Sequence, residues 1–179
     1  MPLTAQQAEM VKAWEDHLAA EFAMKSIDAT MATMTPNPFV NHVPTMTGGI
    51  GYENVKNFYS TDFLPGHPAD TKSIFVRRTI GDSSIVDELV HTFTHDIEMP
   101  WILPGVPPTH SKVEVAIVVV VEFEGGKVQG ERIYWDQASV LAQIGLLDAA
   151  KLPICGAEAA RKVIDPSAEP SNTLIQRSK

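Results

Sequence analysis

Apolar residues in the first part of the chain recur every three or four positions, the spacing that gathers them on one face of a helix. This spacing predicts helices over about residues 4–22, 26–35 and 52–64. Thr4 and Gln7 have the separation of a capping box and mark the start of the first helix. The N-terminal region is therefore expected to be mainly helical.

Between the second and third of these helices the pattern is interrupted. Asn41–Pro44 is expected to be extended, because the residue before a proline avoids the helical region of backbone conformation. Gly48, Gly49 and Gly51 follow closely and indicate a loop.

From residue 73 onward the sequence is typical of β-strands. Alternating and β-branched residues predict strands over 73–80, 84–97, 111–124 and 127–136. The run 117–121 is apolar on both faces, which is typical of a central strand covered on both sides. We expect helices to cover one side, and a partner or more of the chain to cover the other.

Helices followed by four long antiparallel strands indicate an α+β fold. We predict a strongly curved antiparallel sheet that wraps around the N-terminal helices as a cone with one open mouth. The predicted division is a domain of residues 1–150 and a C-terminal extension of residues 151–179, with a short helix over 156–164 and a polar tail. Such a cone offers a concave apolar pocket to a small molecule.

Composition excludes several function classes. The net charge is −8 and no basic stretch is present, so we expect no nucleic-acid partner. The longest apolar run, Val115–Val121, has seven residues, whereas a membrane helix needs about 20. Cys155 is the only cysteine and the N-terminus does not resemble a secretory signal, so a cytoplasmic location is expected.

Glu131 is the first candidate for chemistry, because it lies mid-strand among apolar and aromatic neighbours. Burial of a carboxylate raises its pKa and suits it to act as a general acid or base. Alternatively, Glu131 lies on a solvated face and pairs with Lys127 or Arg77.

Several segments resemble the SnoaL-like branch of the NTF2-like superfamily, over roughly residues 4–148. They are the N-terminal helix, Asn41–Pro44, Phe93–Asp96, Pro107–Thr109 with Lys112–Val115, and Gly126–Val128 through Tyr134–Asp136. The resemblance implies a cone-shaped α+β barrel (the NTF2-like fold) that usually forms a homodimer. It also implies acid–base chemistry on a hydrophobic small molecule, without cofactor or metal.

In the family's cyclases and epoxide hydrolase, the last strand carries a catalytic Asp six residues after its first Lys. Counted from Lys127, that position is Ile133. Glu131 lies two residues earlier and shares the face of Ile133 and Trp135, so it is the natural substitute acid.

The resemblance also suggests polar pocket residues on earlier strands. An Arg-x-Asp triplet of the epoxide hydrolase corresponds to Thr94–Asp96, which keeps the Asp and lacks the Arg. Asp96 is thus a candidate base, or else a turn residue at the end of its strand. His42 lies where relatives place a polar pocket residue, and its pKa suits proton transfer near neutrality. The alternative is a histidine that packs beside Pro44.

Further residues are expected to bind the substrate or to pack nearby. Trp101 lies in a long loop that either covers the mouth of the cone or packs at a dimer interface. One of Tyr134 and Trp135 should face the pocket and the other an interface. His91 and His95 share the strand face opposite Asp96, which is poor geometry for a metal site. The expected substrate-binding set is Trp101, Trp135, Tyr59, Tyr134, Ile133 and Thr94.

Two functions follow from the sequence. The first is a cofactor-free enzyme in which Glu131, Asp96 and His42 transfer protons during isomerisation, cyclisation or dehydration of a hydrophobic, oxygenated molecule. The second is a non-catalytic binding or dimerising module, which Ile133 at the position of the family's acid favours.

Overall fold

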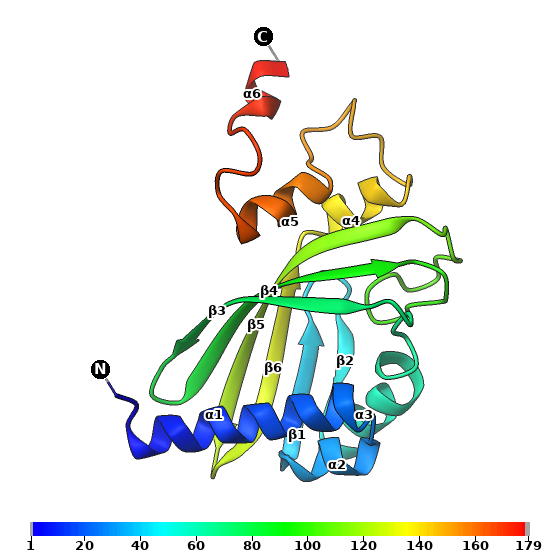
Figure 1. The fold of residues 1–179 in the computed structure, drawn as a ribbon. Helices are drawn as coiled ribbons and strands as arrows, with labels where there is room; N and C mark the ends of the chain where they lie inside the picture. Colours follow the sequence, from blue (N-terminus) through cyan, green and yellow to red (C-terminus); the bar gives the residue numbers. More distant parts are fainter. Residues whose placement is uncertain (1, 178–179) are drawn as a thin grey trace.

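The computed structural model describes residues 2–177 and shows one curved sheet with helices against it (Figure 1). The strands are β1 (Met34–His42), β2 (Thr47–Ile50), β3 (Lys72–Ile80), β4 (Ser84–Thr94), β5 (Lys112–Glu124) and β6 (Lys127–Trp135). The helical elements are α1 (Ala5–Leu18), the π-helical turn η1 (Ala19–Ala23), α2 (Ile27–Ala32), α3 (Tyr52–Phe58), the π-helical turn η2 (Tyr59–Phe63), α4 (Gln137–Gln143), α5 (Ala157–Ile164) and α6 (Thr173–Arg177).

The N-terminal helices form close to their predicted positions, although α2 ends at Ala32 and Met34 and Thr35, predicted as helical, begin β1. The Thr4 hydroxyl accepts from the backbone of Gln7, and the Gln7 side chain accepts from the backbone of Thr4, so the capping box is complete. Ser26 caps α2 by accepting from the backbone of Ala29. Both long helical segments end in a π-helical turn, which the sequence pattern did not indicate.

The sheet has six strands in the order β2-β1-β6-β5-β4-β3. The prediction of four antiparallel strands was incomplete, because β1 adds to β6 in parallel and β2 pairs with β1. Gly48 and Gly49, predicted as a loop, belong to β2. Pro36 and Pro38 lie inside β1, where the pairing with β6 shifts register between Met34 and Phe39. A proline is tolerated at such an irregularity because its missing N–H breaks no ladder bond there.

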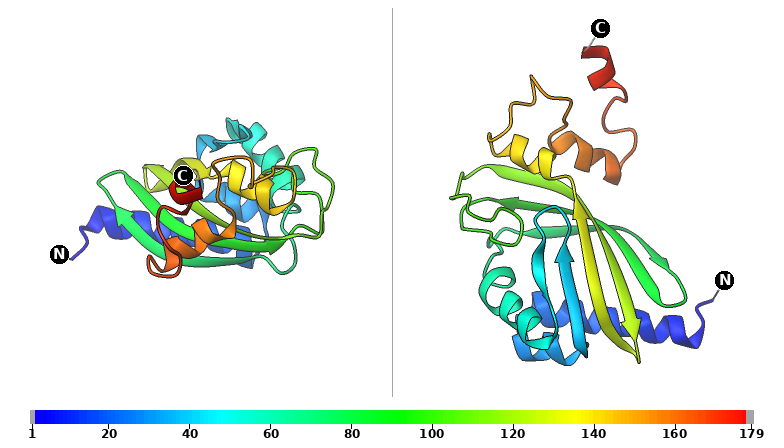
Figure 2. Two further views of the ribbon diagram at one scale, coloured as in Figure 1. Left: turned by 90° about the horizontal axis from the view of Figure 1, so that it is seen from above. Right: turned by 180° about the vertical axis from the view of Figure 1, so that it is seen from behind.

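Side chains of the central strands alternate between the two faces of the sheet. The inner face of β5 is buried, at Val113, Val115, Ile117, Val119 and Val121. Helix α1 lies across this concave face, and α2 and α3 lie beside it (Figures 1 and 2). The helices and the inner face together enclose the hydrophobic core, so the predicted α+β cone is confirmed.

The C-terminal extension covers part of the outer face. Helix α5 packs on β5 and β4, where Ala160 is buried and Arg161 lies 3.4 Å from Glu114. The side chain of Gln143 exchanges two hydrogen bonds with the backbone of Glu114, which joins α4 to the start of β5. The sequence predicted that either a partner or more of the chain covers the second face of this central strand. At this end of β5, more of the chain covers it.

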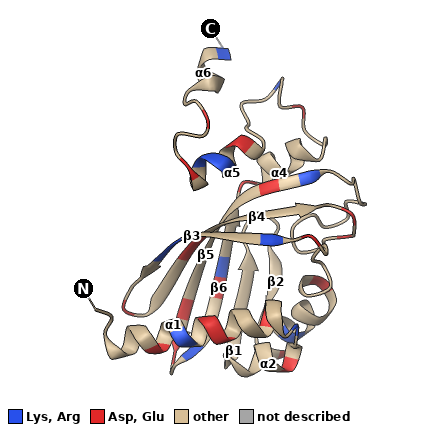
Figure 3. Cartoon of the chain, viewed as in Figure 1, with Lys and Arg blue, Asp and Glu red and all other residues tan. Residues whose placement is uncertain are grey.

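Charged residues are spread over the molecule. In the view of Figure 3, Lys and Arg are scattered among acidic residues and form no continuous stripe. Among residues 2–177, none of the helices combines the length and the apolar character needed to span a membrane.

Candidate active site

A cavity of about 420 Å³ lies between the inner face of the sheet and the N-terminal helices. Its walls are mainly apolar and aromatic, and they come from α1, η1, η2, β1, β3–β6 and the loop after β4. The aromatic residues are Trp14, Phe22, Tyr59, Phe63, Phe75 and Trp101. The volume is within the range typical of small-molecule sites, about 300–1,000 Å³.

Four polar side chains meet at one wall of this cavity. The hydroxyl of Tyr59 donates to Oε1 of Glu131 over 2.9 Å and lies 3.3 Å from Nε2 of His17. The same nitrogen of His17 lies 3.3 Å from Oε1 of Glu131 and 3.0 Å from Oε1 of Glu21. We call His17, Glu21, Tyr59 and Glu131 the carboxylate cluster. All four are buried, and each except His17 contributes to the cavity wall.

The contacts of His17 indicate that both of its ring nitrogens carry a proton. The Thr33 hydroxyl has one proton, which it donates to the carbonyl of Thr30 over 2.6 Å. It must therefore accept from Nδ1 of His17, which lies 2.6 Å away. Nε2 faces two carboxylate oxygens, so its contacts are attractive when it too is protonated. His17 is thus held as an imidazolium between Glu21 and Glu131.

Burial and charge shift the pKa values within the cluster. Burial lowers the pKa of His17, but the charge of Glu21 and hydrogen bonds to Glu131 and Glu21 outweigh it and raise the pKa from 6.5 to about 10. Burial raises the pKa of Glu21 against the opposing charge of His17. Burial and the charge of Glu131 raise the pKa of the Tyr59 hydroxyl well above its usual value. At neutral pH, Tyr59 is therefore a hydrogen-bond donor.

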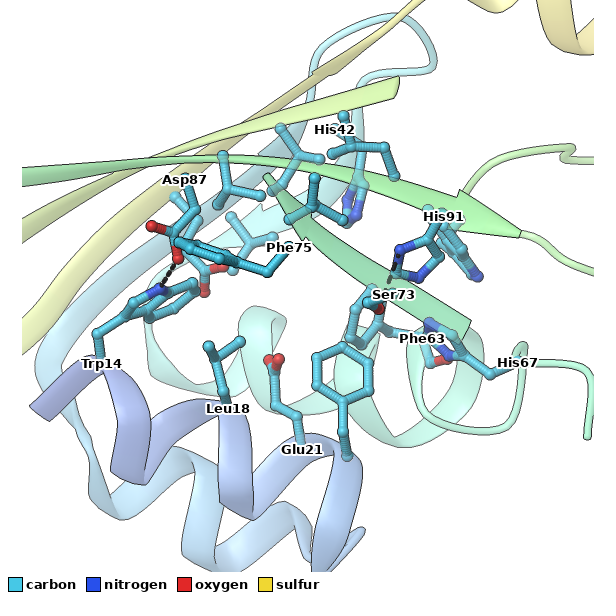
Figure 4. Close-up of a pocket in the computed structure, with 18 of the residues that line it drawn as sticks. Trp14, Leu18, Glu21, His42, Phe63, His67, Ser73, Phe75, Asp87 and His91 are labelled. Atoms are coloured by element: carbon cyan, nitrogen blue, oxygen red, sulfur yellow. Dashed lines mark hydrogen bonds between the residues drawn. The ribbon is translucent and has the colours of Figure 1, made fainter. Parts of the chain in front are cut away.

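Two members of the cluster lie in the π-helical turns. Glu21 belongs to η1 and Tyr59 to η2. Such turns are rare and occur frequently at functional sites, because the extra residue changes the direction of neighbouring side chains. Figure 4 shows the carboxylate of Glu21 pointing from the N-terminal helical segment into the cavity.

Three histidines contribute neutral rings to the cavity wall. Burial lowers the pKa of His42 and of His67 to about 4, and that of His91 to about 3. His42 packs among the rings of Phe58, Phe63, Trp101 and Trp135, and its Nδ1 has no hydrogen-bond partner among the described residues. His67 donates from Nδ1 to the carbonyl of Phe63. Nδ1 of His91 lies 3.2 Å from the Ser73 hydroxyl.

A separate ion pair, between Arg78 and Asp87, forms another part of the cavity wall. Asp87 accepts from Nε and Nη2 of Arg78, both over 2.7 Å, and from the indole nitrogen of Trp14, also over 2.7 Å. Figure 4 shows the bond from Trp14 at this end of the cavity. With three hydrogen bonds to its two oxygens, Asp87 is a structural link between α1, β3 and β4.

The structure places several residues of the predicted site at the cavity. Glu131 and His42, two of the three predicted catalytic residues, line it. Tyr59, Trp101 and Ile133, three of the residues predicted to bind the substrate, also line it. Trp101 is buried and donates to the carbonyl of Gly66, so its loop is packed into the core. Trp135 is also buried and borders the wall through its ring contacts with His42 and Trp101.

The other predicted residues lie away from the cavity. Asp96 is exposed beyond the end of β4, where its backbone N–H bonds to the Thr94 carbonyl. Thr94 instead binds the carboxylate of Asp70 through its backbone and hydroxyl. Tyr134 is 43% exposed on the outer face. These placements have two causes. Strand alternation turns Thr94 and Tyr134 outward, and β4 ends before Asp96.

His17 and Glu21 were missed in the sequence, although a signal was present. The buried positions Met10, Trp14, His17 and Glu21 follow one another at helical spacing. Two polar residues thus occupy the apolar face of the first helical segment, and a buried polar residue requires a partner. That face was predicted from its apolar members alone.

The cluster also contains the atoms from which a metal ion could take ligands. One nitrogen of His17 and one oxygen each of Glu21 and Glu131 lie within 4.8 Å of one another. Their mutual distances are those of hydrogen bonds to an imidazolium, which accounts for the arrangement without an ion.

Comparison with known proteins agrees with this fold. The sequence model of the SnoaL-like polyketide cyclase family matches residues 8–144. The chain belongs to the SnoaL-like polyketide cyclase family. The matched segment contains the whole sheet and all four residues of the carboxylate cluster. No curated protein matches the chain.

Solved structures similar to this SnoaL-like chain share its fold at low sequence identity. A protein assigned as a SnoaL-like polyketide cyclase from Jannaschia sp. CCS1 has a TM-score of 0.68 and 19% identity, covering 83% of this chain and 99% of its own. AclR from Streptomyces galilaeus, assigned as a hydroxylase, has a TM-score of 0.60 and 17% identity, covering 79% and 88%. SalBIII, an epoxide hydrolase/cyclase-like enzyme of pyran ring formation in salinomycin, has a TM-score of 0.56 and 12% identity, covering 74% and 95%.

Proposed function

We propose that this SnoaL-like protein is a cofactor-free enzyme that transfers protons within a hydrophobic small molecule. The reaction would be an isomerisation, cyclisation or dehydration of a substrate that contains a carbonyl or hydroxyl group. The observation that carries the proposal is the carboxylate cluster at the wall of an apolar cavity. The structural neighbours assigned as a polyketide cyclase and as an epoxide hydrolase/cyclase-like enzyme support this class of chemistry.

Glu131 is the proposed base. Tyr59 and His17 both contact Oε1 of Glu131, so these partners hold the carboxylate in one orientation. Its other oxygen can take a proton from a carbon or hydroxyl of the substrate. The imidazolium of His17 stays protonated and stabilises the negative charge of Glu131.

Glu21 is the proposed acid. Burial raises its pKa, which favours the protonated form. It can return a proton to the substrate at a second atom and then recover the proton that Glu131 has taken, through solvent or the cluster. The proton balance closes without an external oxidant or reductant. The apolar walls keep water away from the intermediate carbanion or enolate.

His42 has a different proposed role from the one its sequence position indicated. Burial lowers its pKa to about 4, so it carries no proton to give as an imidazolium at neutral pH. A neutral imidazole can still accept or donate one hydrogen bond to a substrate oxygen. Asp96 is exposed, and we assign it no part in the reaction.

Proton exchange tests this proposal before the natural substrate is known. Cyclic ketones that fit the cavity are incubated with the protein in deuterated water, and exchange at the α-carbon is followed by NMR. The native protein should accelerate exchange, and Glu131→Gln should reduce it by about 10²–10⁴-fold, the usual contribution of a general base. Glu124→Gln, at an exposed site on β5, is the matched control. Equal exchange by Glu131→Gln and the native protein would exclude Glu131 as the base.

A binding module is the second candidate. Ile133 lines the cavity where the family's catalytic acid would stand, which favours binding without turnover. Ligand binding with no exchange for any bound carbonyl compound would support this alternative over the enzyme.

A further inference from the structure

The carboxylate cluster contains two acidic side chains and one basic side chain. Glu21 and Glu131 are two carboxylates, and among residues 2–177 their ion pairs are with His17 alone. One imidazolium balances one carboxylate, so ionisation of both leaves one buried negative charge. An unpaired buried charge is costly, and a group of opposite charge in the cavity would offset this cost.

Among the described residues, the rest of the cavity wall supplies no balancing cation. Arg78 lines the wall, but both of its ion pairs are with acidic residues, Asp87 and Glu15. The three neutral histidines add no charge, since burial lowers their pKa values to about 4 or below. The whole chain has a net charge of −8, so its long-range field also favours cations over anions.

The geometry leaves the cluster open to a ligand. The contacts from His17 and Tyr59 to Glu131, and from His17 to Glu21, all end on Oε1 atoms. These contacts leave the second oxygen of Glu131 for a group in the cavity. Glu21 also interacts with the Tyr59 hydroxyl, and Figure 4 shows its carboxylate pointing into the cavity. Around these carboxylates the wall is aromatic, and the faces of such rings attract organic ammonium ions.

We propose that the cavity binds a compound in which a protonated or quaternary amine is attached to a hydrophobic body, with the amine against Glu21 and Glu131. The hydrophobic body packs on the aromatic and aliphatic wall. Anionic compounds are repelled, and neutral compounds offer the two carboxyl groups no opposite charge, whereas an ammonium group favours the ionised form of both. If the protein is the proposed proton-transfer enzyme, these hydrophobic amines are its substrate class. That role in turnover rests on the proposed function, whereas binding of the amine does not.

A pair of compounds with the same shape tests the charge alone. Benzyltrimethylammonium and neopentylbenzene differ in having N⁺ or carbon at one position. Binding of each to the full chain at pH 8 is measured by the fluorescence of Trp14 and Trp101, which line the cavity. The cation should bind at least tenfold more tightly than the neutral compound, and phenylacetate should bind more weakly than either. Equal affinity for the cation and its neutral isostere would overturn the proposal without any variant.

Two variants locate the binding site. Glu21→Gln and Glu131→Gln each remove one charge and should bring the affinity for benzyltrimethylammonium close to that for neopentylbenzene. Glu124→Gln removes the same charge at an exposed position and should leave both affinities unchanged. A cation preference that persists in both cluster variants would place the amine elsewhere and contradict the proposal.

The outcomes separate this proposal from the proposed reaction. A cation preference without any proton exchange would defeat the enzyme and keep the amine site. Exchange that depends on Glu131, together with equal affinity for the two isosteres, would keep the enzyme and defeat the amine site.

Discussion

The hydroxyl of Tyr59 lies 2.9 Å from Oε1 of Glu131, although the two residues are 72 positions apart in the chain. Tyr59 comes from η2 in the helical layer, and Glu131 comes from the middle of β6 in the sheet. The bond therefore joins the helical layer to the sheet at the point where the cavity wall becomes polar.

Replacement of Tyr59 by Phe should reduce proton transfer and keep the fold. The ring still fills its place in the core, but Glu131 loses its neutral donor and can change orientation. A hydrogen bond to a charged group contributes about 1.5–3 kcal/mol, so we expect exchange to fall by about 10–100-fold. The measurement is the NMR exchange rate, with circular dichroism as the control for folding. An unchanged rate would show that Tyr59 does not orient the base.

His17→Gln should strongly destabilise the protein. The substitution removes the buried cation and leaves Glu21 and Glu131 facing each other. Loss of one partner from a buried ion pair costs about 3–5 kcal/mol. Urea unfolding at pH 7 measures this, and Lys12→Gln is the control because its pair with Asp16 lies on the exposed surface. A loss no larger than that of the control would contradict an imidazolium at this position.

The same residue predicts a specific dependence on alkaline pH. The pKa of His17 is raised from 6.5 to about 10 in the folded chain. A raised folded-state pKa gives stability that is fully present below pH 6.5 and is lost as the pH rises toward 10, because the folded chain then binds more protons than the unfolded chain. The unfolding free energy of the native protein should decrease over this interval, and that of His17→Gln should change less. Parallel curves for the two proteins would show that His17 is neutral in the fold.

The sequence predicted the strands and helices better than it predicted the site. Alternation along β6 correctly placed Glu131 and Ile133 on one face and Tyr134 on the other. Asp96 was chosen by analogy with a triplet on a long strand, but β4 ends at Thr94 and no alternation extends beyond it. A pattern within one strand cannot show where that strand ends.

The cluster required information that local patterns lack. His17, Tyr59 and Glu131 come from three separate elements, and their meeting depends on where α1 crosses the sheet. The π-helical turns also rotate the ends of two helical segments, and apolar periodicity did not reveal them. The parallel strand β1 was missed because its two prolines are atypical of a strand inside a sheet.

The buried neutral histidines should make the protein sensitive to acid. Folded-state pKa values of about 4 for His42 and about 3 for His91 lie below the ordinary 6.5. Between these values the unfolded chain binds more protons, so stability is fully present above pH 6.5 and decreases as the pH falls. Each such residue contributes up to about 1.4 kcal/mol per pH unit.

A single replacement separates this effect from the protonation of carboxylates. His91→Asn removes a titrating ring and keeps an amide near the Ser73 hydroxyl. The difference in unfolding free energy between pH 7 and pH 4.5 should become smaller in this variant than in the native protein. His110→Asn, at an exposed position, is the control and should retain the native difference. A difference that stays the same in His91→Asn would exclude a neutral buried ring there.

Gly130 should tolerate no side chain, because the ring of Phe39 occupies the space beside it. The two residues are paired across β1 and β6, and an added Cβ would overlap Cε1 of Phe39. The ring is also held by the guanidinium of Arg132, 4.8 Å from its centre. Overpacking costs about 1–3 kcal/mol, and the displaced backbone is that of Glu131 as well. Gly130→Ala should therefore lower both the unfolding free energy and the exchange rate. A double-mutant cycle with Phe39→Ala tests this packing. In the Phe39→Ala background, Gly130→Ala should have a much smaller effect, because the clash is absent. An equal loss of unfolding free energy in both backgrounds would contradict the packing.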